Sequence, residues 1–186
     1  MAAAKSNPFR VQRLDKLQYH LEGATWDELM ARLKKARYRG AVIGPHGHGK
    51  STLLESLQPH LEAEGWKVHR IQLNTGKRRL DTAQRALLTQ LDKNDCLFLD
   101  GAEQLHALAW RTFLWQSRKA GALVITAHRA GLLPTIWECN TSVALLNELV
   151  QELDPQNKDG NITELFQKHH GNLRDALREL YDSHSL

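Results

Sequence analysis

Apolar positions recur along the chain with two different periods, which distinguish predicted helices from predicted strands. Over residues 26–37 the apolar side chains stand three and four positions apart, which is the spacing of one face of a helix. Thr25 and Glu28 occupy the positions of a capping box, in which each side chain bonds the backbone of the other residue. The pattern therefore predicts a helix over residues 26–37, preceded by a polar arm.

Downstream of this helix, short apolar runs alternate with amphipathic stretches. The runs predict strands over residues 40–44, 67–74, 96–100, 122–128 and 142–146. The stretches predict helices over residues 51–64, 80–93 and 103–121, followed by further helices with a turn over 154–161. Because strands that alternate with helices pair in parallel through right-handed crossovers, we expect a three-layer α/β/α fold with a mainly parallel sheet.

The length of 186 residues suits one domain with a sizeable core. We expect an N-terminal arm and helix over residues 1–38, a core over 39–147 and a small helical C-terminal segment over 148–186. Hydrophobic residues at 41% and charged residues at 25% are typical of a globular chain and exclude a disordered one. The net charge of +4 permits an anionic partner without requiring one.

Two features of the sequence predict a cytoplasmic protein. The start lacks the apolar stretch of a secretory signal, and no segment approaches the roughly 18 apolar residues of a membrane span. The two cysteines, Cys96 and Cys139, are too few for a disulfide framework, and Cys96 lies in an apolar run where a thiol behaves as a small hydrophobe.

The most specific motif is "GPHGHGKST", residues 44–52. Gly44, Gly49, Lys50 and Ser51 satisfy G-x-x-x-x-G-K-[ST], and the motif falls between a predicted strand and a predicted helix. Such glycines let backbone N–H groups surround phosphate oxygens, while the lysine reaches the β- and γ-phosphates and the serine hydroxyl can coordinate Mg²⁺. We therefore expect a phosphate-binding loop (P-loop) with these residues in contact with nucleotide: Gly44, Pro45, His46, Gly47, His48, Gly49, Lys50, Ser51 and Thr52.

The two histidines of this loop raise the alternative of a metal site. A zinc site needs a third and a fourth ligand in a shared geometry, which two loop residues at i and i+2 do not supply. We therefore interpret His46 and His48 as side chains that fill the loop. A glycine-rich turn that binds nothing is the other alternative for the motif.

The segment "GPHGHGKS" resembles the G-P-P-G-x-G-K-[ST] form of the P-loop in AAA+ and related RecA-like ATPases, with His46 where the second proline often stands. The resemblance runs over residues 26–181, although the C-terminal segment is shorter than a complete AAA+ lid. It implies a P-loop NTPase fold that binds ATP and Mg²⁺ as cofactors.

The resemblance extends to an acidic strand end. "CLFLDGAEQL" looks like a Walker B strand, which implies that Asp100 and Ser51 hold Mg²⁺. AAA+ proteins usually place a glutamate directly after this aspartate, whereas this chain has Gly101 and its next carboxylate at Glu103. Glu103 is therefore the candidate base for hydrolysis. In the alternative interpretations, Asp100 caps the next helix and Glu103 is an acid favoured by the helix dipole.

Two further positions resemble sensor residues of the same family. "ALVITAHR" is similar to the strand that ends near the γ-phosphate, which implies a sensor role for Thr126, or else for His128. "GNLRDALREL" looks like the helix from which an arginine reaches the nucleotide, and Arg174 fits that place. Alternatively, Thr126 satisfies backbone groups at a strand end and Arg174 is an exposed helical arginine.

Weaker signals concern partners. Basic residues cluster over 32–39 and 77–79, where they either contact nucleic-acid phosphates or simply keep the surface solvated. The helix over 103–121 is apolar around much of its circumference, which indicates burial between the sheet and the C-terminal helices or else an interface in a homo-oligomer. In a ring, one of three arginines could act in trans: Arg111, Arg118 or Arg129.

Three functions are consistent with the sequence. The first is an ATPase (a hydrolase of acid anhydrides) or ATP switch that couples nucleotide binding to a protein or nucleic-acid partner. The second is a small-molecule kinase, for which residues 74–81, "NTGKRRLD", are the one hint of a basic lid. The third is an ATP-dependent interaction module that does not hydrolyse ATP, suggested by Gly101. The chain lacks the N-K-x-D motif of GTPases and the L-S-G-G-Q stretch of ABC transporters.

Overall fold

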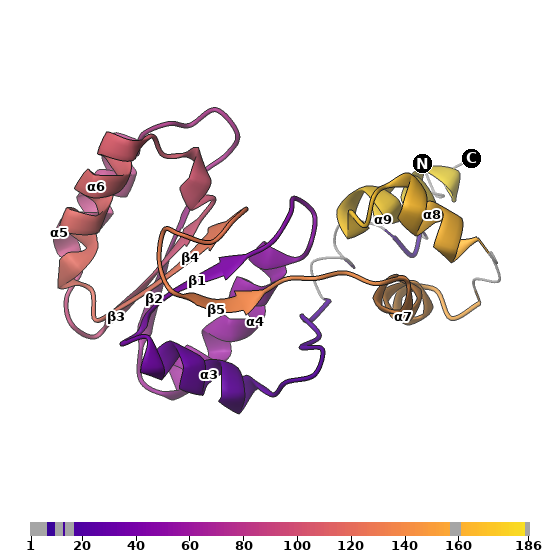
Figure 1. Ribbon diagram of the computed structural model, residues 1–186, viewed down its shortest axis with the longest axis horizontal. Helices are drawn as coiled ribbons and strands as arrows, with labels where there is room; N and C mark the ends of the chain where they lie inside the picture. The colour runs from indigo at the N-terminus through magenta and orange to yellow at the C-terminus, as the bar shows by residue number, and fades with distance from the viewer. Residues whose placement is uncertain (1–6, 10–12, 14–16, 157–160, 185–186) are drawn as a thin grey trace.

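A parallel five-stranded sheet forms the centre of the protein (Figure 1). The structure, a computed structural model, describes residues 7–9, 13, 17–156 and 161–184. The strand order is β2-β3-β4-β1-β5, and each neighbouring pair is parallel, as predicted. The strands are β1 (Arg39–Ile43), β2 (Lys67–Gln72), β3 (Asp95–Asp100), β4 (Ala122–Ala127) and β5 (Thr135–Glu138).

Helices cover both faces of this sheet and make the predicted three-layer α/β/α arrangement (Figure 1). One face carries α3 (Trp26–Lys35) and α4 (Lys50–Ala63), and the other carries α5 (Thr82–Gln90) and α6 (Ala107–Gln116). The short 3₁₀ helices η1 (Ala102–Gln104) and η2 (Ser117–Lys119) flank α6. The predicted capping box of Thr25 and Glu28 begins α3.

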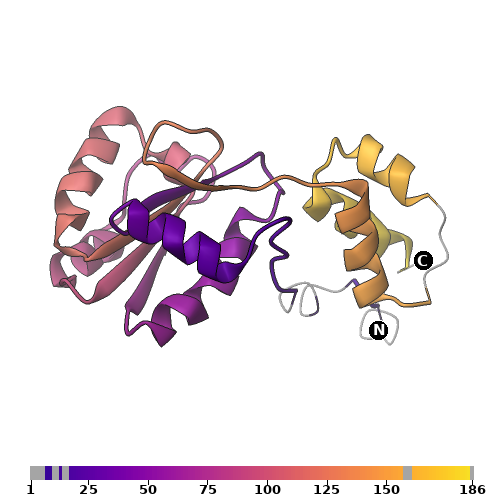
Figure 2. The same cartoon turned by 60° about the horizontal axis from the view of Figure 1, so that its bottom comes forward.

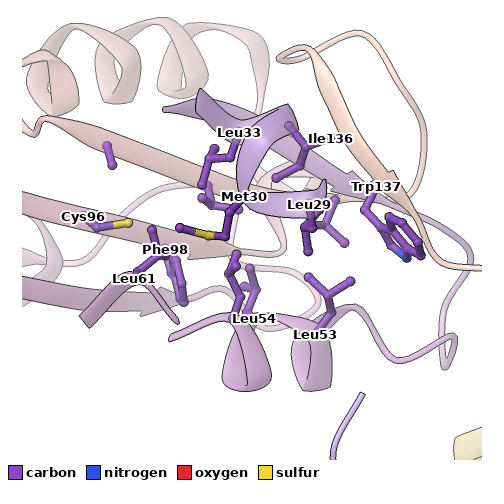
Figure 3. Close-up of a cluster of buried hydrophobic side chains, with 14 of the residues drawn as sticks. Leu29, Met30, Leu33, Leu53, Leu54, Leu61, Cys96, Phe98, Ile136 and Trp137 are labelled. Carbon is purple, nitrogen blue, oxygen red and sulfur yellow. The ribbon is translucent and has the colours of Figure 1, made fainter. Parts of the chain in front are cut away.

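The core between the sheet and helices α3 and α4 is closely packed (Figure 3). Leu29 from α3, Leu54 from α4 and Phe98 from β3 all have an exposed fraction of 0% in this layer. Leu54 lies one turn behind the P-loop, so the apolar face of α4 fixes the loop against the sheet. Cys96 is buried in the same cluster, as its apolar run predicts.

Replacement of Leu54 by alanine is expected to lower the free energy of unfolding by about 2–5 kcal/mol, because the lost side chain leaves a cavity in a layer that cannot collapse fully. Leu108→Ala removes the same atoms from a side chain that is 72% exposed and is expected to change stability by less than about 0.5 kcal/mol. Urea unfolding followed by circular dichroism measures both. Equal losses in the two variants would contradict the packing.

The last three helices form a separate group beyond the carboxyl ends of the strands (Figure 2). They are α7 (Val143–Leu153), α8 (Ile162–Lys168) and α9 (Leu173–Ser183). Phe9 from the N-terminal arm is buried among α7 and α9, and the Asn7 side-chain amide donates to the Tyr181 carbonyl at 2.8 Å. The arm therefore returns to the C-terminal helices. Parts of the predicted arm and of the turn over 154–161 lie outside the described residues.

The prediction of a strand over residues 142–146 is wrong. Ser142 caps a helix there, because its hydroxyl accepts from the Leu145 backbone N–H, and the apolar residues that follow recur at three and four positions along α7. The last strand is instead β5, whose Ile136 and Trp137 are buried. Since α7 begins at Val143, the helical C-terminal part begins before the expected boundary at residue 148.

The expected burial of the helix over 103–121 beneath the C-terminal helices is also wrong. The helix begins only at Ala107, and α6 packs on the sheet through Phe113 while Leu108 and Trp115 are 72% and 62% exposed. The C-terminal helices instead lie beyond the carboxyl ends of the strands (Figure 1). Among the helices that the structure describes, none is long and apolar enough to cross a membrane.

Candidate nucleotide-binding site

The P-loop connects the end of β1 to the start of α4, as its sequence context predicts. Gly47 and Gly49 both have a φ of +78°, in the left-handed region that glycine adopts without strain. A Cβ on Gly44 would lie 2.7 Å from the Cys139 carbonyl oxygen, so the loop packs closely against the chain after β5. These glycines let the backbone N–H groups approach an anion at the N-terminus of α4.

Gly47 also contacts the C-terminal helices. A Cβ there would lie 1.8 Å from Asn172 Oδ1, and this oxygen is fixed because it accepts from the Asp175 N–H as the N-cap of α9. The P-loop and the start of α9 are therefore in direct contact.

Replacement of Gly47 by alanine is expected to weaken ATP binding about tenfold or more, because the methyl group must push Asn172 away and the backbone conformation becomes strained. Gly65→Ala is the matched control: Gly65 has a φ of +91°, but a Cβ there meets no atom of the described residues within 4 Å. Calorimetric titration with ATP compares the two. Similar losses of affinity in both variants would show that backbone strain alone is responsible.

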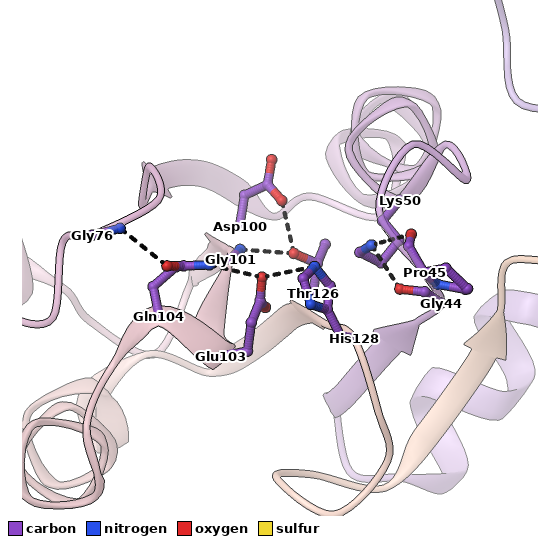
Figure 4. A network of polar contacts seen from close by, with 10 residues as sticks. All are labelled: Gly44, Pro45, Lys50, Gly76, Asp100, Gly101, Glu103, Gln104, Thr126 and His128. Atoms are coloured by element: carbon purple, nitrogen blue, oxygen red, sulfur yellow. Dashed lines mark hydrogen bonds and ion pairs between the residues drawn. The ribbon is translucent and has the colours of Figure 1, made fainter. Parts of the chain in front are cut away.

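Lys50 lies half-buried at the centre of the site (Figure 4). Its Nζ donates to the carbonyl oxygens of Gly44 and Pro45, both at 2.7 Å. Burial lowers the pKa of this ammonium from its ordinary value, while the nearby Glu103 carboxylate opposes that shift. The loop thus holds the lysine by two bonds that a phosphate oxygen can replace.

Asp100 and Thr126 are bonded to each other at the ends of two adjacent parallel strands, β3 and β4. The Thr126 hydroxyl donates to Asp100 Oδ1 at 2.7 Å and accepts from the Gly101 N–H at 2.7 Å (Figure 4). Both side chains are buried, with exposed fractions of 6% for Asp100 and 0% for Thr126. Thr126 therefore positions the carboxylate and also satisfies a backbone N–H at the strand end, whereas its role as a sensor stays a prediction.

Gly101 explains why no glutamate directly follows Asp100. Its φ is +88°, and a Cβ would lie 2.7 Å from the Leu73 carbonyl oxygen. A side chain at this position would therefore clash with the backbone after β2, and a base must come from another residue.

Glu103 supplies the next carboxylate, from η1. Its Oε1 lies 3.3 Å from His128 Nε2 and accepts from the Gln104 side-chain amide at 3.4 Å (Figure 4). Its Oε2 is buried and has no hydrogen-bond partner in the described part of the chain. An unpartnered buried carboxylate oxygen is costly, and a water or a ligand group bonded to it would remove that penalty.

Arg70 is one of two charged residues at the site that sequence reasoning missed, the other being its partner Glu55. From β2 its guanidinium donates to Glu55 Oε1 at 2.8 Å and to Asp100 Oδ2 at 3.0 Å. The alternation along β2 could have indicated this position. Arg70 stands two residues after Val68, so both side chains lie on the face of the strand toward α4.

A cavity of about 630 Å³ unites the predicted residues from all parts of the chain. Gly44 and Pro45 do not line it; their carbonyl oxygens accept from Lys50 Nζ. The predicted residues that line the cavity are His46, Gly47, His48, Gly49, Lys50, Ser51, Thr52, Asp100, Glu103, Thr126, His128 and Arg174.

The other end of the cavity is apolar. Residues 17–20 of the arm line it together with leucines of α7 and α9, of which Leu145 and Leu177 are buried. The Tyr19 hydroxyl accepts from Trp137 Nε1 at 3.1 Å. The Tyr19 backbone N–H donates to the Ser56 hydroxyl at 2.9 Å. The cavity therefore has a charged end at the P-loop and an apolar end between the arm and the last helices.

The loop histidines differ from each other. Burial lowers the pKa of His48 from its ordinary value, so this ring is neutral at pH 7. His46 is exposed and lies edge-on to His128, with 6.4 Å between ring centroids. Within the described residues, no group of three or more histidine, cysteine, aspartate or glutamate side chains could hold a metal ion.

Solved structures share this architecture. A Thermotoga maritima RuvB Holliday junction branch migration motor is 22% identical, with a TM-score of 0.57 over 83% of this chain and 58% of its own. The Drosophila ORC bound to DNA is 15% identical, with a TM-score of 0.60 over 100% of this chain and 61% of its own. The chain thus spans about three fifths of the length of these proteins. Neither a family model nor a curated protein sequence matches it. The sheet order, the P-loop and these similarities together show that the chain has the α/β P-loop fold of the AAA+ ATPases.

Proposed function

We propose that the chain binds ATP with Mg²⁺ and hydrolyses it, and that this cycle controls a partner. The observation that carries the proposal is the cavity at the ends of the strands. Lys50 and the Asp100–Thr126 pair converge there with Glu103 Oε2, which has no hydrogen-bond partner among the described residues. Ligands of α/β sheets bind at these carboxyl ends of the strands.

The residues of the site fit a triphosphate. The glycine loop surrounds an anion, the α4 N-terminus attracts it, and Lys50 exchanges its two carbonyl partners for phosphate oxygens. Arg174, exposed at the start of α9 and lining the cavity, adds a second cation from the opposite side. The apolar end between Tyr19 and the leucines of α7 and α9 suits the adenine ring.

The oxygen donors also fit magnesium. Ser51 lies in the first turn of α4 on the cavity wall, and Asp100 lines the same cavity from β3. Hydroxyl and carboxylate oxygens are the donors that Mg²⁺ prefers, and it usually retains several waters. Because Asp100 already bonds Thr126 and Arg70, it would hold the ion through water, and the bound metal would neutralise charge on the phosphates.

The hydrolytic step needs a base for the attacking water. Glu103 Oε2 is free to accept the proton, while His128 and Gln104 hold the other oxygen in place. Thr126 keeps Asp100 beside the P-loop during this step.

The partner is proposed from the similar structures and from charge. The RuvB protein is a Holliday junction motor and the ORC structure contains DNA, so a nucleic acid is the first partner to test, in a homo-oligomer. Lys77, Arg78 and Arg79 are exposed in the loop after β2, where they could bind phosphates. Gly76 of this loop donates to Gln104, the neighbour of Glu103, at 3.3 Å.

Phosphate release from ATP, measured beside ATP binding with and without duplex and single-stranded DNA, tests the proposal. Turnover above buffer supports it. Transfer of labelled phosphate to a metabolite without net release would instead show a kinase, and tight binding without turnover under every condition would show a module that does not hydrolyse ATP.

A further inference from the structure

The guanidinium of Arg70 bridges two elements of the nucleotide site. It spans from Glu55 on α4 to Asp100 on β3, with donor distances of 2.8 Å and 3.0 Å. Glu55 stands four residues after Ser51 on α4 and lines the same cavity. Arg70 therefore lies beside the oxygen atoms that would attract Mg²⁺.

Arg70 holds this position at an energetic cost. Its side chain is only 28% exposed, and its Nε is buried without a hydrogen-bond partner in the described residues. A buried donor without a partner destabilises a fold, so the two carboxylates have to offset it. Arginine is suited to this bridge because its planar fork can donate to two carboxylates at once.

The bridge changes what Asp100 can offer a metal ion. One carboxylate oxygen bonds Thr126 and the other bonds Arg70, so both oxygens have protein partners. The positive guanidinium also repels a second cation at short range, and a site with low exposure screens this repulsion weakly. A metal ion that arrives with the nucleotide must share Asp100 with Arg70 or displace it.

We propose that Arg70 sets the magnesium requirement of this site by competing with the ion for Asp100. The inference rests on the proposed binding of ATP. With Arg70 in place, a high magnesium concentration is needed for the ion to engage Asp100. Without Arg70, the free carboxylate binds the hydrated ion more tightly.

Titration of magnesium chloride into protein and a fluorescent N-methylanthraniloyl derivative of ATP measures this competition through anisotropy, starting in EDTA. Arg70→Ala is expected to lower the magnesium concentration at half-maximal binding about tenfold. Arg70→Gln, which keeps part of the stem and a donor, is expected to shift it in the same direction and guards against misfolding of the alanine variant. Arg85→Ala removes the same charge from an exposed position on α5 and is expected to leave the midpoint unchanged.

A change at Glu55 gives an independent readout. Glu55→Gln removes the second carboxylate that binds Arg70, so that Asp100 is the remaining carboxylate in the bridge. The magnesium concentration at half-maximal binding is therefore expected to rise about threefold. In a chain that also carries Arg70→Ala this rise is expected to disappear, because the two residues act through one bridge.

The outcomes separate this inference from the proposed function. Nucleotide binding with the same magnesium midpoint in wild type, both Arg70 variants and the Arg85 control overturns the role of Arg70 alone. Absence of nucleotide binding by the wild type at every magnesium concentration overturns the proposed function and this inference together.

Discussion

Lys50→Ala is expected to raise the dissociation constant for ATP by about 100-fold or more and to abolish turnover. The Lys50 ammonium donates to the carbonyl oxygens of Gly44 and Pro45, and phosphate oxygens can replace both of these acceptors. Hydrogen bonds to charged groups contribute about 1.5–3 kcal/mol each, so the loss of two contacts with phosphate accounts for the expected change. Calorimetric titration with ATP measures it.

The control must show that the charge matters at this place. Lys93→Ala removes the same charge from an exposed position before β3 and is expected to leave ATP affinity within about twofold of wild type. Thermal unfolding of Lys50→Ala checks that the loop still folds. ATP binding by Lys50→Ala within threefold of wild type would contradict a nucleotide site at the P-loop.

Short apolar runs and glycine spacing were enough to predict the sheet and the P-loop. Four of the five strands are found where the sequence predicted them. β1, β3 and β4 are almost wholly buried, as inner strands of a parallel sheet are, whereas the edge strand β2 was predicted from its alternation. The bond between Asp100 and Thr126 also follows from this topology, since residues at the carboxyl ends of adjacent parallel strands lie side by side.

The edge of the sheet could not be predicted in this way. β5 has only four residues, and two of them are exposed, so its apolar signal is weaker than that of residues 142–146. Those residues belong to a helix because Ser142 bonds the first turn, which is a local contact that a short apolar run does not reveal. The error therefore arose because β5 has a weaker apolar pattern than the first turn of α7.

Arg70 and α6 show two other limits. The contact of Arg70 with Asp100 depends on the pairing of β2 with β3, which puts residues 30 positions apart next to each other. The exposure of Leu108 and Trp115 depends on where the last helices dock, and these helices lie beyond the carboxyl ends of the strands and do not cover α6. Neither fact is contained in a local pattern.

Glu103→Gln is expected to keep ATP affinity within about threefold of wild type and to lower the rate of phosphate release by about 100-fold or more, the range that a general base supplies. The amide preserves the size and the bonds to Gln104 and His128, but it cannot accept a proton from water. Gly101 leaves no room for a glutamate directly after Asp100, and Glu103 Oε2 has no hydrogen-bond partner in the part of the chain that the structure describes, so it can accept the proton. Glu62→Gln, an exposed change on α4, is the matched control. Turnover by Glu103→Gln at the wild-type rate would show that another group activates the water, and that the Glu103 contact with His128 serves only to hold η1 against the end of β4.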